Sequence, residues 1–332
     1  MTELTGITAP SRVRGALRTF LRWREAGIIV VAVGLIAYFH ASTGQFLSES
    51  NLVNVAQYIA PIAIIATGEV LLLVSGQLDL SVGSVFALSP FLMYYATEAY
   101  GMPVLLGVLI ALLASGVIGM VNGLVTVRLG VPPFVTTMGM LFLIGGLTLT
   151  VSGSYPRQIP SDIENVQWWL GSAPWAEICW ALLIVLVFHL VLTRTRWGLH
   201  TIATGGNPNA AAEAGIRTDR VKIGNFVACS ALAGFAGIIE AFRINTIDPT
   251  AGGTDVMFAA IAAAVIGGTA LAGGSGTVLG ALLGAVVLGV LQVGFNLTGI
   301  SAYLFDLILG AAILLAMVAN VRLASLRRAG GA

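Results

Sequence analysis

A short polar segment, residues 75–85, separates two long apolar stretches and constrains the fold more than any other part of the chain. The segment contains two glycines, Gln77 and Asp79. Lipid cannot satisfy the backbone groups of such a segment, so at membrane depth it must be buried in protein or line a polar cavity. The pattern therefore predicts a membrane helix that breaks near Ser75 and resumes near Val82. Transporters use broken helices of this kind to build sites and gates.

The residues of the break have distinct expected roles. We expect Asp79 or Ser81 to cap the resumed helix by accepting a hydrogen bond from a backbone N–H in its first turn. Gly76 and Gly83 permit the tight turn and the close packing that the break demands. Two further polar residues, Gln77 and Ser84, complete the candidate site at the break.

The composition indicates an integral membrane protein. Hydrophobic residues make up 57% of the 332 residues and charged residues only 9%, whereas a soluble domain carries about 25% charged residues. The two cysteines, Cys179 and Cys229, lie in apolar stretches without a CxxC motif. We expect both to be buried, small apolar residues, with no disulfide between them.

Ten apolar segments predict an all-α polytopic fold with broken helices, in which the third and eighth segments are short for a span. The segments cover residues 26–42, 52–74, 82–97, 103–127, 131–151, 175–193, 223–242, 255–272, 277–298 and 302–321. Residues 26–321 thus form one membrane domain. A basic arm, residues 1–25, precedes this domain, and a basic tail, residues 322–332, follows it.

The basic residues predict the orientation of the chain. With both termini in the cytoplasm, fourteen of the sixteen Lys and Arg residues lie on the cytoplasmic side. Only Arg157 and Arg243 lie outside. Because cytoplasmic loops carry an excess of basic residues, we expect both termini to be cytoplasmic. The sequence also lacks a cleavable signal peptide of the expected form.

Several kinds of chemistry find no support in the sequence. Lys222 is the only lysine, and nothing fits the phosphate-binding pattern G-x-x-x-x-G-K-[ST], so the chain cannot hydrolyse ATP by that mechanism. The three histidines stand apart from one another and from acids at ligand spacing. We therefore expect no enzyme activity, no metal site, no cofactor and no nucleic-acid partner.

The longest cytoplasmic connection between membrane segments, residues 194–222, predicts a short helix. Asn207 is a good N-cap, Pro208 fits the first helical position, and Gly215 can end the helix in the left-handed conformation. Two turns are too few for a stable isolated helix, so it must pack against something. It rests either on its own membrane domain or on a partner protein.

Polar residues inside the apolar segments indicate the kind of solute. Acids there are rare and usually functional, and Glu69 lies about 9 Å beyond the middle of the second segment. It either faces the pathway or holds helices together by hydrogen bonds. The amides Asn122 and Asn296 and several hydroxyls suit a neutral, hydroxyl-rich solute better than an ion. A sugar, a nucleoside and a polyol would be handled by the same groups.

The outer face carries two basic residues, Arg157 and Arg243, among several acids. Exposed basic residues of this kind pair with carboxylates of a docking protein and orient it. The alternative is a solvated side chain, or one that faces lipid headgroups, of little energetic consequence.

Two segments resemble a known family. The run Leu78-Asp79-Leu80-Ser81-Val82-Gly83-Ser84 resembles the signature of the inner-membrane permease subunits of ribose-, xylose- and galactose-type ATP-binding-cassette importers. The segment from Gly205 to Ile216 resembles the short coupling helix of that family, which inserts into a groove of the ATPase subunit. The family form usually has two glycines before Ile-Asp-Leu, and Ser75-Gly76-Gln77-Leu78 departs from it. The sugar and the subfamily therefore stay open.

The resemblance implies the partners and the function. Two copies, or this chain and a paralogue, are expected to form a central pathway in the cytoplasmic membrane. A separate ATPase is expected inside and a periplasmic or lipid-anchored solute-binding protein outside. The residues expected to couple ATP hydrolysis to the membrane domain are Gly205, Gly206, Asn207, Ala211, Glu213, Ala214, Gly215 and Ile216.

The expected function is import of a monosaccharide, with pentoses first. Two alternatives stay open. One is a related permease for a nucleoside, a polyol or a branched-chain amino acid. The other is a secondary transporter or channel that needs no ATPase.

Overall fold

The computed structural model describes residues 25–159 and 164–299, together with some helical residues between 304 and 318. The predicted basic arm, except for Glu25, and the predicted basic tail lie outside the described residues, as does most of the tenth apolar segment. In the described part of the chain the fold is mainly helical, with one two-stranded sheet.

Seven described helices are long and apolar enough to cross a membrane. They are α2 (Ala26–Thr43), α3 (Glu49–Val74), α5 (Val104–Arg128), α6 (Pro133–Ser152), α8 (Ala176–Arg194), α11 (Thr218–Ile244) and α13 (Val278–Thr298). The third and eighth predicted segments correspond to the shorter helices α4 (Val82–Glu98) and α12 (Gly253–Ile266). The predicted class of polytopic helical membrane protein is therefore confirmed, and the number of ten spans stays a prediction.

Short elements fill the connections between these helices. They are β1 (Arg157–Gln158), α7 (Glu164–Gln167), the π-helix η2 (Trp168–Ser172), α9 (Arg196–Gly206), α10 (Pro208–Glu213) and β2 (Thr246–Ile247). The two strands pair in antiparallel register, with Arg157 opposite Ile247. This pairing joins the connection after α6 to the connection after α11.

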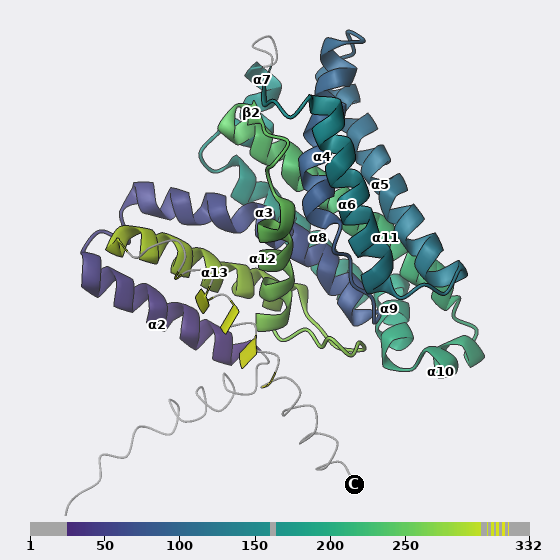
Figure 1. The fold of residues 1–332 in the computed structure, drawn as a ribbon. Helices are drawn as coiled ribbons and strands as arrows, with labels where there is room; N and C mark the ends of the chain where they lie inside the picture. Colours follow the sequence, from purple (N-terminus) through teal and green to yellow (C-terminus); the bar gives the residue numbers. More distant parts are fainter. Residues whose placement is uncertain are drawn as a thin grey trace, which may run out of the picture.

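Helix α3 forms the centre of the fold. It is buried along most of its length, because it packs against α8 and α11 as well as α12 and α13 (Figure 1). Helix α11 in turn packs against α4 and α5. Several of these contacts depend on glycine: a Cβ atom added to Gly83 of α4 would lie 1.8 Å from the carbonyl oxygen of Gly253 in α12. Small residues let membrane helices approach this closely.

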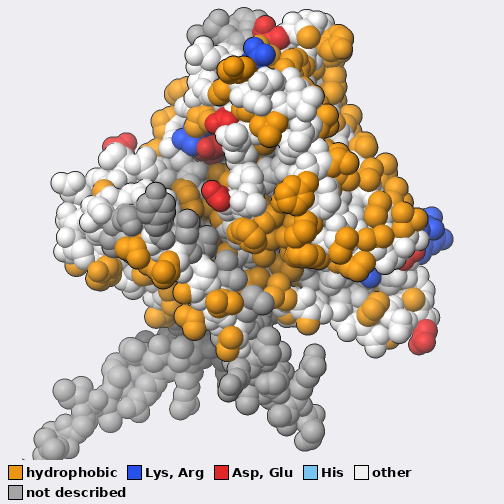
Figure 2. Space-filling view, viewed as in Figure 1, with side chains coloured by type: hydrophobic (Ala, Val, Ile, Leu, Met, Phe, Trp, Pro, Cys, Tyr) orange, Lys and Arg blue, Asp and Glu red, His pale blue; other side chains and the backbone are white. Residues whose placement is uncertain are grey.

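Apolar side chains cover much of the outside. Figure 2 shows broad hydrophobic areas, with sparse charged side chains at the top, in the upper middle and at the lower right edge of this face. Many of the exposed apolar side chains belong to α2, α5, α6 and α8. An apolar exterior on helices of this length suits a lipid environment.

Contacts at the helix ends agree with the predicted topology. Arg128 at the end of α5 and Asp219 at the start of α11 approach to 3.9 Å, and both ends are expected to be cytoplasmic. The strands β1 and β2 join two connections that are both expected to lie outside. Ends predicted for one side thus lie together, while the assignment of inside and outside stays a prediction.

The two cysteines differ from each other. Cys229 in α11 is fully buried, as expected, but Cys179 in α8 is exposed, and both are free. The prediction was wrong for Cys179 because the face of a membrane helix that points away from the protein is as apolar as the face that points inward. An apolar neighbourhood in the sequence therefore does not indicate burial.

Candidate functional site

The predicted helix break is present. Helix α3 ends at Val74 and α4 begins at Val82. Gly76 has a φ of +76°, in the left-handed region where glycine is favoured. The backbone N–H of Gln77 donates to the carbonyl of Leu72 at 2.8 Å, and the backbone N–H of Gly76 donates to the carbonyl of Leu73 at 2.9 Å. Carbonyls in the last turn of α3 thus find hydrogen-bond partners.

Asp79 is the centre of a buried polar cluster. Its Oδ1 accepts hydrogen bonds from the backbone N–H of Ser81 at 2.8 Å and from the Ser81 hydroxyl at 2.6 Å. The side-chain amide of Asn122 in α5 donates to Oδ2 at 3.2 Å, and the hydroxyl of Ser230 in α11 lies 3.2 Å from the same oxygen. All four side chains are fully buried. The carboxylate thus ties the break to two other helices.

The expected capping role of Asp79 and Ser81 needs a correction. Ser81 is the N-cap residue of α4, and its side chain makes no capping hydrogen bond. Asp79 accepts from Ser81 itself, one residue before the first helical turn. The Ser81 hydroxyl oxygen instead accepts a hydrogen bond from the side-chain amide of Asn122 at 2.9 Å, while its proton is donated to Asp79.

Ser230 is a member of this cluster that sequence reasoning missed. It lies 151 residues beyond Asp79, inside the apolar segment that forms α11. The only signal in the sequence is a hydroxyl among apolar residues, and serine is common in membrane helices.

Glu69 lies near the cluster, in α3. It is fully buried, and its Oε1 lies 3.7 Å from the sulfur of Cys229. Cys229 directly precedes Ser230 in α11, and Ser230 hydrogen-bonds to Asp79. In the described part of the chain no ion pair involves either acid. Two buried acids without a basic partner are costly in a membrane, and such residues usually serve a function.

The other residues predicted for the break fall into two groups. Gln77 is buried and donates to the carbonyl of Gly76, and Ser84 donates to the carbonyl of Leu141 in α6 at 2.9 Å. Asn296, in contrast, is exposed near the end of α13, and the described structure shows no hydrogen bond between it and the Asp79 cluster. The structure therefore does not bring Asn296 to the break.

The predicted short helix is also present, as α10. The Asn207 side chain accepts a hydrogen bond from the backbone N–H of Ala210 at 3.1 Å, and Pro208 occupies the first turn. Gly215 has a φ of +82°, and the amide of Ile216 donates to the carbonyl of Ala211 at 3.0 Å. This geometry confirms the predicted cap and end of the helix.

Helices α9 and α10 with the turn that follows, residues 196–216, form what we call the α9–α10 arm. Ala211 is buried, whereas Asn207, Glu213 and Ala214 are exposed. The arm therefore offers an exposed surface that carries Asn207 and Glu213 at the ends of α10 and apolar side chains such as Leu199 on α9. Its residues Thr201, Thr204 and Gly198 face the membrane domain and are buried.

Gly205 of the arm meets the break directly. A Cβ atom added to Gly205 would lie 1.7 Å from the carbonyl oxygen of Val74, the last residue of α3. The same oxygen accepts a hydrogen bond at 2.8 Å from the amide of Gly274, in the loop between α12 and α13. A Cβ atom added to Gly206, by comparison, would meet open space. The arm, the break and the α12–α13 loop thus meet at one backbone carbonyl.

The two outer arginines have different environments. Arg157 is exposed on β1. The guanidinium of Arg243 lies 3.2 Å from the buried carboxylate of Glu177 and also pairs with Glu240. Arg243 is thus not the free, exposed cation that the docking prediction requires. Sequence reasoning did not consider Glu177, whose only signal is an acid in the first turn of an apolar segment.

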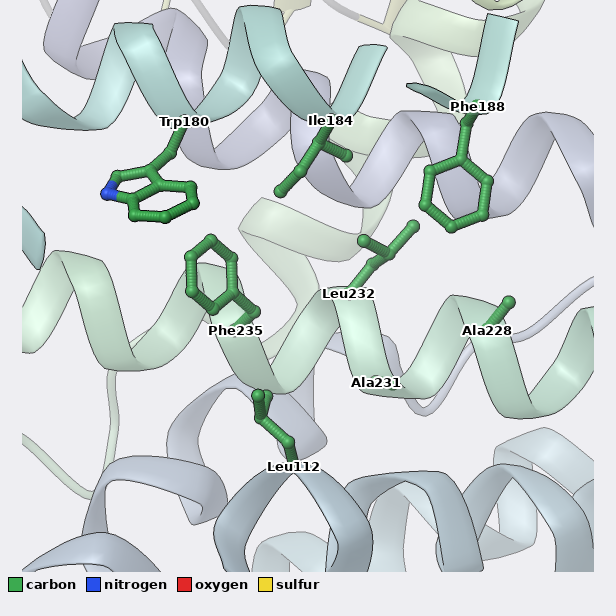
Figure 3. Close-up of a pocket in the computed structure, with 8 residues that line it drawn as sticks. All are labelled: Leu112, Trp180, Ile184, Phe188, Ala228, Ala231, Leu232 and Phe235. Atoms are coloured by element: carbon green, nitrogen blue, oxygen red, sulfur yellow. The ribbon is translucent and has the colours of Figure 1, made fainter. Parts of the chain in front are cut away.

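An apolar pocket of about 270 Å³ lies between α5, α8 and α11. Figure 3 shows Trp180 and Phe188 of α8 facing Leu232 and Phe235 of α11, with Leu112 of α5 below. The Trp180 N–H already donates to the carbonyl of Trp169. The lining offers no set of polar groups for a hydroxyl-rich solute, so this pocket is not the candidate solute site.

Comparison with known proteins supports the resemblance to importer permeases that the sequence shows. Residues 51–317 match the family model described as "Branched-chain amino acid transport system / permease component". The chain belongs to this permease family. The xylose/arabinose import permease of Sulfolobus acidocaldarius is 37% identical over 253 residues, which cover 74% of this chain and 70% of that protein.

Two further relatives of the permease are also sugar importers by name. The ribose import permease of Escherichia coli K12 is 34% identical, covering 75% of this chain and 78% of its own. The fructose import permease of Rhizobium meliloti is 31% identical, and the match covers 77% of this chain and 74% of that protein. No solved structure matches the chain.

These comparisons identify the chain as a permease subunit of a sugar ATP-binding-cassette importer, a transport component rather than an enzyme. Such permeases generally work with an ATPase and a solute-binding protein.

Proposed function

We propose that this permease imports a monosaccharide, with pentoses favoured, across the cytoplasmic membrane. The observation that supports ATP-driven import is the meeting of the α9–α10 arm with the helix break at the Val74 carbonyl. Relatives named for xylose, arabinose and ribose support the pentose. A fructose permease among the relatives keeps hexoses as the next choice.

The proposed partners are an ATPase subunit that binds the α9–α10 arm and a solute-binding protein that docks on the outer face. Glu213 and Ala214 are exposed on the arm and available for the first contact, and Arg157 is available for the second. Two copies of the membrane domain, residues 26–321, or one copy and a paralogue, enclose the pathway. The two basic ends of the chain lie in the cytoplasm in this proposal.

The proposed mechanism starts at the arm. ATP binding closes the ATPase dimer and displaces α10, and the displacement reaches the ends of α3 and of the α12–α13 loop through Gly205. The break at residues 75–81 then changes the packing of α4 against α5 and α11, which Asp79 holds through Asn122 and Ser230. This opens the pathway to the outside, where the binding protein delivers solute.

The first experiment is purification of the permease from native membranes in mild detergent, followed by mass spectrometry of the proteins that accompany it. We expect a P-loop ATPase and a solute-binding protein. The ligand of that binding protein, measured by calorimetry against pentoses and hexoses, identifies the solute. Purification of the chain alone, with uptake that survives ATP depletion, would instead indicate a secondary transporter or a channel.

The second candidate is a branched-chain amino acid, because the matching family model carries that description. Leucine, isoleucine and valine therefore belong in the same binding and uptake panel, with nucleosides and polyols. Binding of leucine by the co-purified protein, without binding of any sugar, would replace the sugar proposal.

A further inference from the structure

The side-chain amide of Asn225 joins three helices. Asn225 lies in α11 and is fully buried. Its Oδ1 accepts a hydrogen bond from the indole N–H of Trp197 at 2.9 Å, and its Nδ2 donates to the carbonyl of Leu71 at 3.1 Å. Nδ2 also lies 3.4 Å from the hydroxyl of Thr201. Because Trp197 and Thr201 belong to α9 and Leu71 to the last turn of α3, one amide connects the arm to the end of α3.

The chemistry of these partners requires an amide. An indole N–H can only donate, and a backbone carbonyl can only accept, so the oxygen of Asn225 must face Trp197 and its nitrogen must face Leu71. Aspartate would place an acceptor against the Leu71 carbonyl, and leucine would leave the indole N–H without a partner. Either change therefore removes at least one hydrogen bond of the link between α9 and α3.

Two glycines hold the same helix in place. A Cβ atom added to Gly224 would lie 2.4 Å from the Trp197 ring, so the ring occupies the space over that glycine. At the other end of α9, Gly205 contacts the carbonyl of Val74. Helix α9 thus packs on α11 near its start and on the end of α3 at its own end, and only Asn207 separates it from α10.

We propose that Asn225 is a positioning residue that makes α9 a rigid link between α10 and the helix break at residues 75–81. This inference rests on the proposed function, because it concerns how movement of α10 reaches the pathway. Without the Asn225 amide, α9 moves relative to α3 when the ATPase displaces α10. ATP hydrolysis then continues while less solute is transported for each ATP.

The test uses the full complex of permease, ATPase and binding protein in liposomes, and measures solute transported per ATP hydrolysed. Asn225→Asp removes the donor to Leu71, and Trp197→Phe, at a partly exposed residue, removes only the indole and its donor. We expect each variant to lower the transport ratio about tenfold, because each removes one hydrogen bond of the link. Binding of the ATPase is expected to stay unchanged, because the exposed surface of α10 is not altered.

A matched control and a double variant complete the test. Trp180→Phe removes a comparable indole hydrogen bond on α8, to the carbonyl of Trp169, and is expected to leave the ratio unchanged. The double variant of Asn225→Asp with Trp197→Phe is expected to be no worse than the more impaired single variant, since both break one link.

Three results would overturn the inference. The first is a wild-type ratio in both Trp197→Phe and Asn225→Asp. The second is an equal loss in Trp180→Phe. The third is a loss of uptake and ATP hydrolysis in parallel with a lower midpoint of thermal unfolding, which indicates a purely structural role. Absence of ATP-dependent uptake in the wild-type complex would overturn the proposed function as well, so the two failures are distinguishable.

Discussion

The Nε atom of Arg243 in α11 lies 3.2 Å from Oε2 of Glu177 in the first turn of α8. The Glu177 side chain is only 2% exposed, and the same guanidinium also pairs with Glu240. Arg243 therefore compensates a buried acid and holds two helix ends together. Its arrangement is that of a structural residue, while Arg157 is left as the exposed arginine of the proposed docking surface.

Removal of the Arg243 side chain is expected to destabilise the fold. Arg243→Ala leaves Glu177 buried without a cation, a change that costs about 3–5 kcal/mol for a buried ion pair. The arginine is partly exposed, so we expect the lower end of this range. The measurement is the midpoint of thermal unfolding in detergent. Arg157→Ala is the control, and equal midpoints for the two variants would contradict the assignment.

Asp79→Leu is expected to lower both thermal stability and uptake. The substitution removes the acceptor for Asn122, Ser81 and Ser230, and each buried polar group left unpaired costs about 1–3 kcal/mol. The control is Asp219→Leu. The Asp219 side chain is 53% exposed, and its ion pair with Arg128 is a long surface contact of 3.9 Å that contributes little. Normal uptake and an unchanged unfolding midpoint in Asp79→Leu would show that the cluster is dispensable.

Alanine substitutions at the adjacent residues Gly205 and Gly206 are expected to change the stability of the permease in opposite directions. Gly205→Ala places a Cβ 1.7 Å from the Val74 carbonyl, so the arm or the end of α3 must shift, and we expect lower stability and lost uptake. Gly206→Ala meets open space within the same helix. Alanine is a better helix former than glycine, and Gly206 is the last residue of α9, so Gly206→Ala should be neutral or slightly stabilising. Thermal unfolding and uptake of both variants, measured side by side, decide whether the contact at Gly205 matters.

A charge reversal on the arm is expected to uncouple ATP hydrolysis from uptake. Glu213 is exposed on α10, so Glu213→Arg should leave the membrane domain folded while it disturbs the contact with the ATPase. We expect ATP-driven uptake to fall about fivefold or more, the lower end of typical coupling energies. Glu98→Arg, at the exposed end of α4, is the control. Unchanged sugar uptake in Glu213→Arg would remove this segment from the mechanism.

Local features were predictable from the sequence because their causes are local. The tight turn at Gly76, the left-handed Gly215 and the N-cap at Asn207 follow from the chemistry of a few neighbouring residues, and the structure confirms them. The nine helices expected in the described part of the chain follow from the length of apolar segments. Several ends shift by a few residues because polar residues such as Glu49 and Asp219 extend the helices beyond the apolar core. Helix α12 instead ends at Ile266, before the predicted end at residue 272, because the chain turns at Gly268, which has a φ of +87°.

Features that depend on distant partners were not predictable. Arg243 and Glu177 are 66 positions apart, and nothing in either neighbourhood indicates that they meet. Asn296 has the same residue type as Asn122, yet one is exposed and the other holds Asp79. In a membrane helix the inward and outward faces are both apolar, so periodicity does not reveal which face carries the contacts.

The central place of α3 has a consequence for biosynthesis. Glu69 contacts the sulfur of Cys229, which follows 160 residues later in the chain. At a synthesis rate of about 5–20 residues per second, a ribosome needs roughly 8–32 s to add those residues. During that time α3 has left the ribosome with a carboxyl group in its apolar stretch, and neither α11 nor the later helices α12 and α13 exist to surround it. The insertion machinery must therefore retain or shield this helix until the second half of the protein has been made.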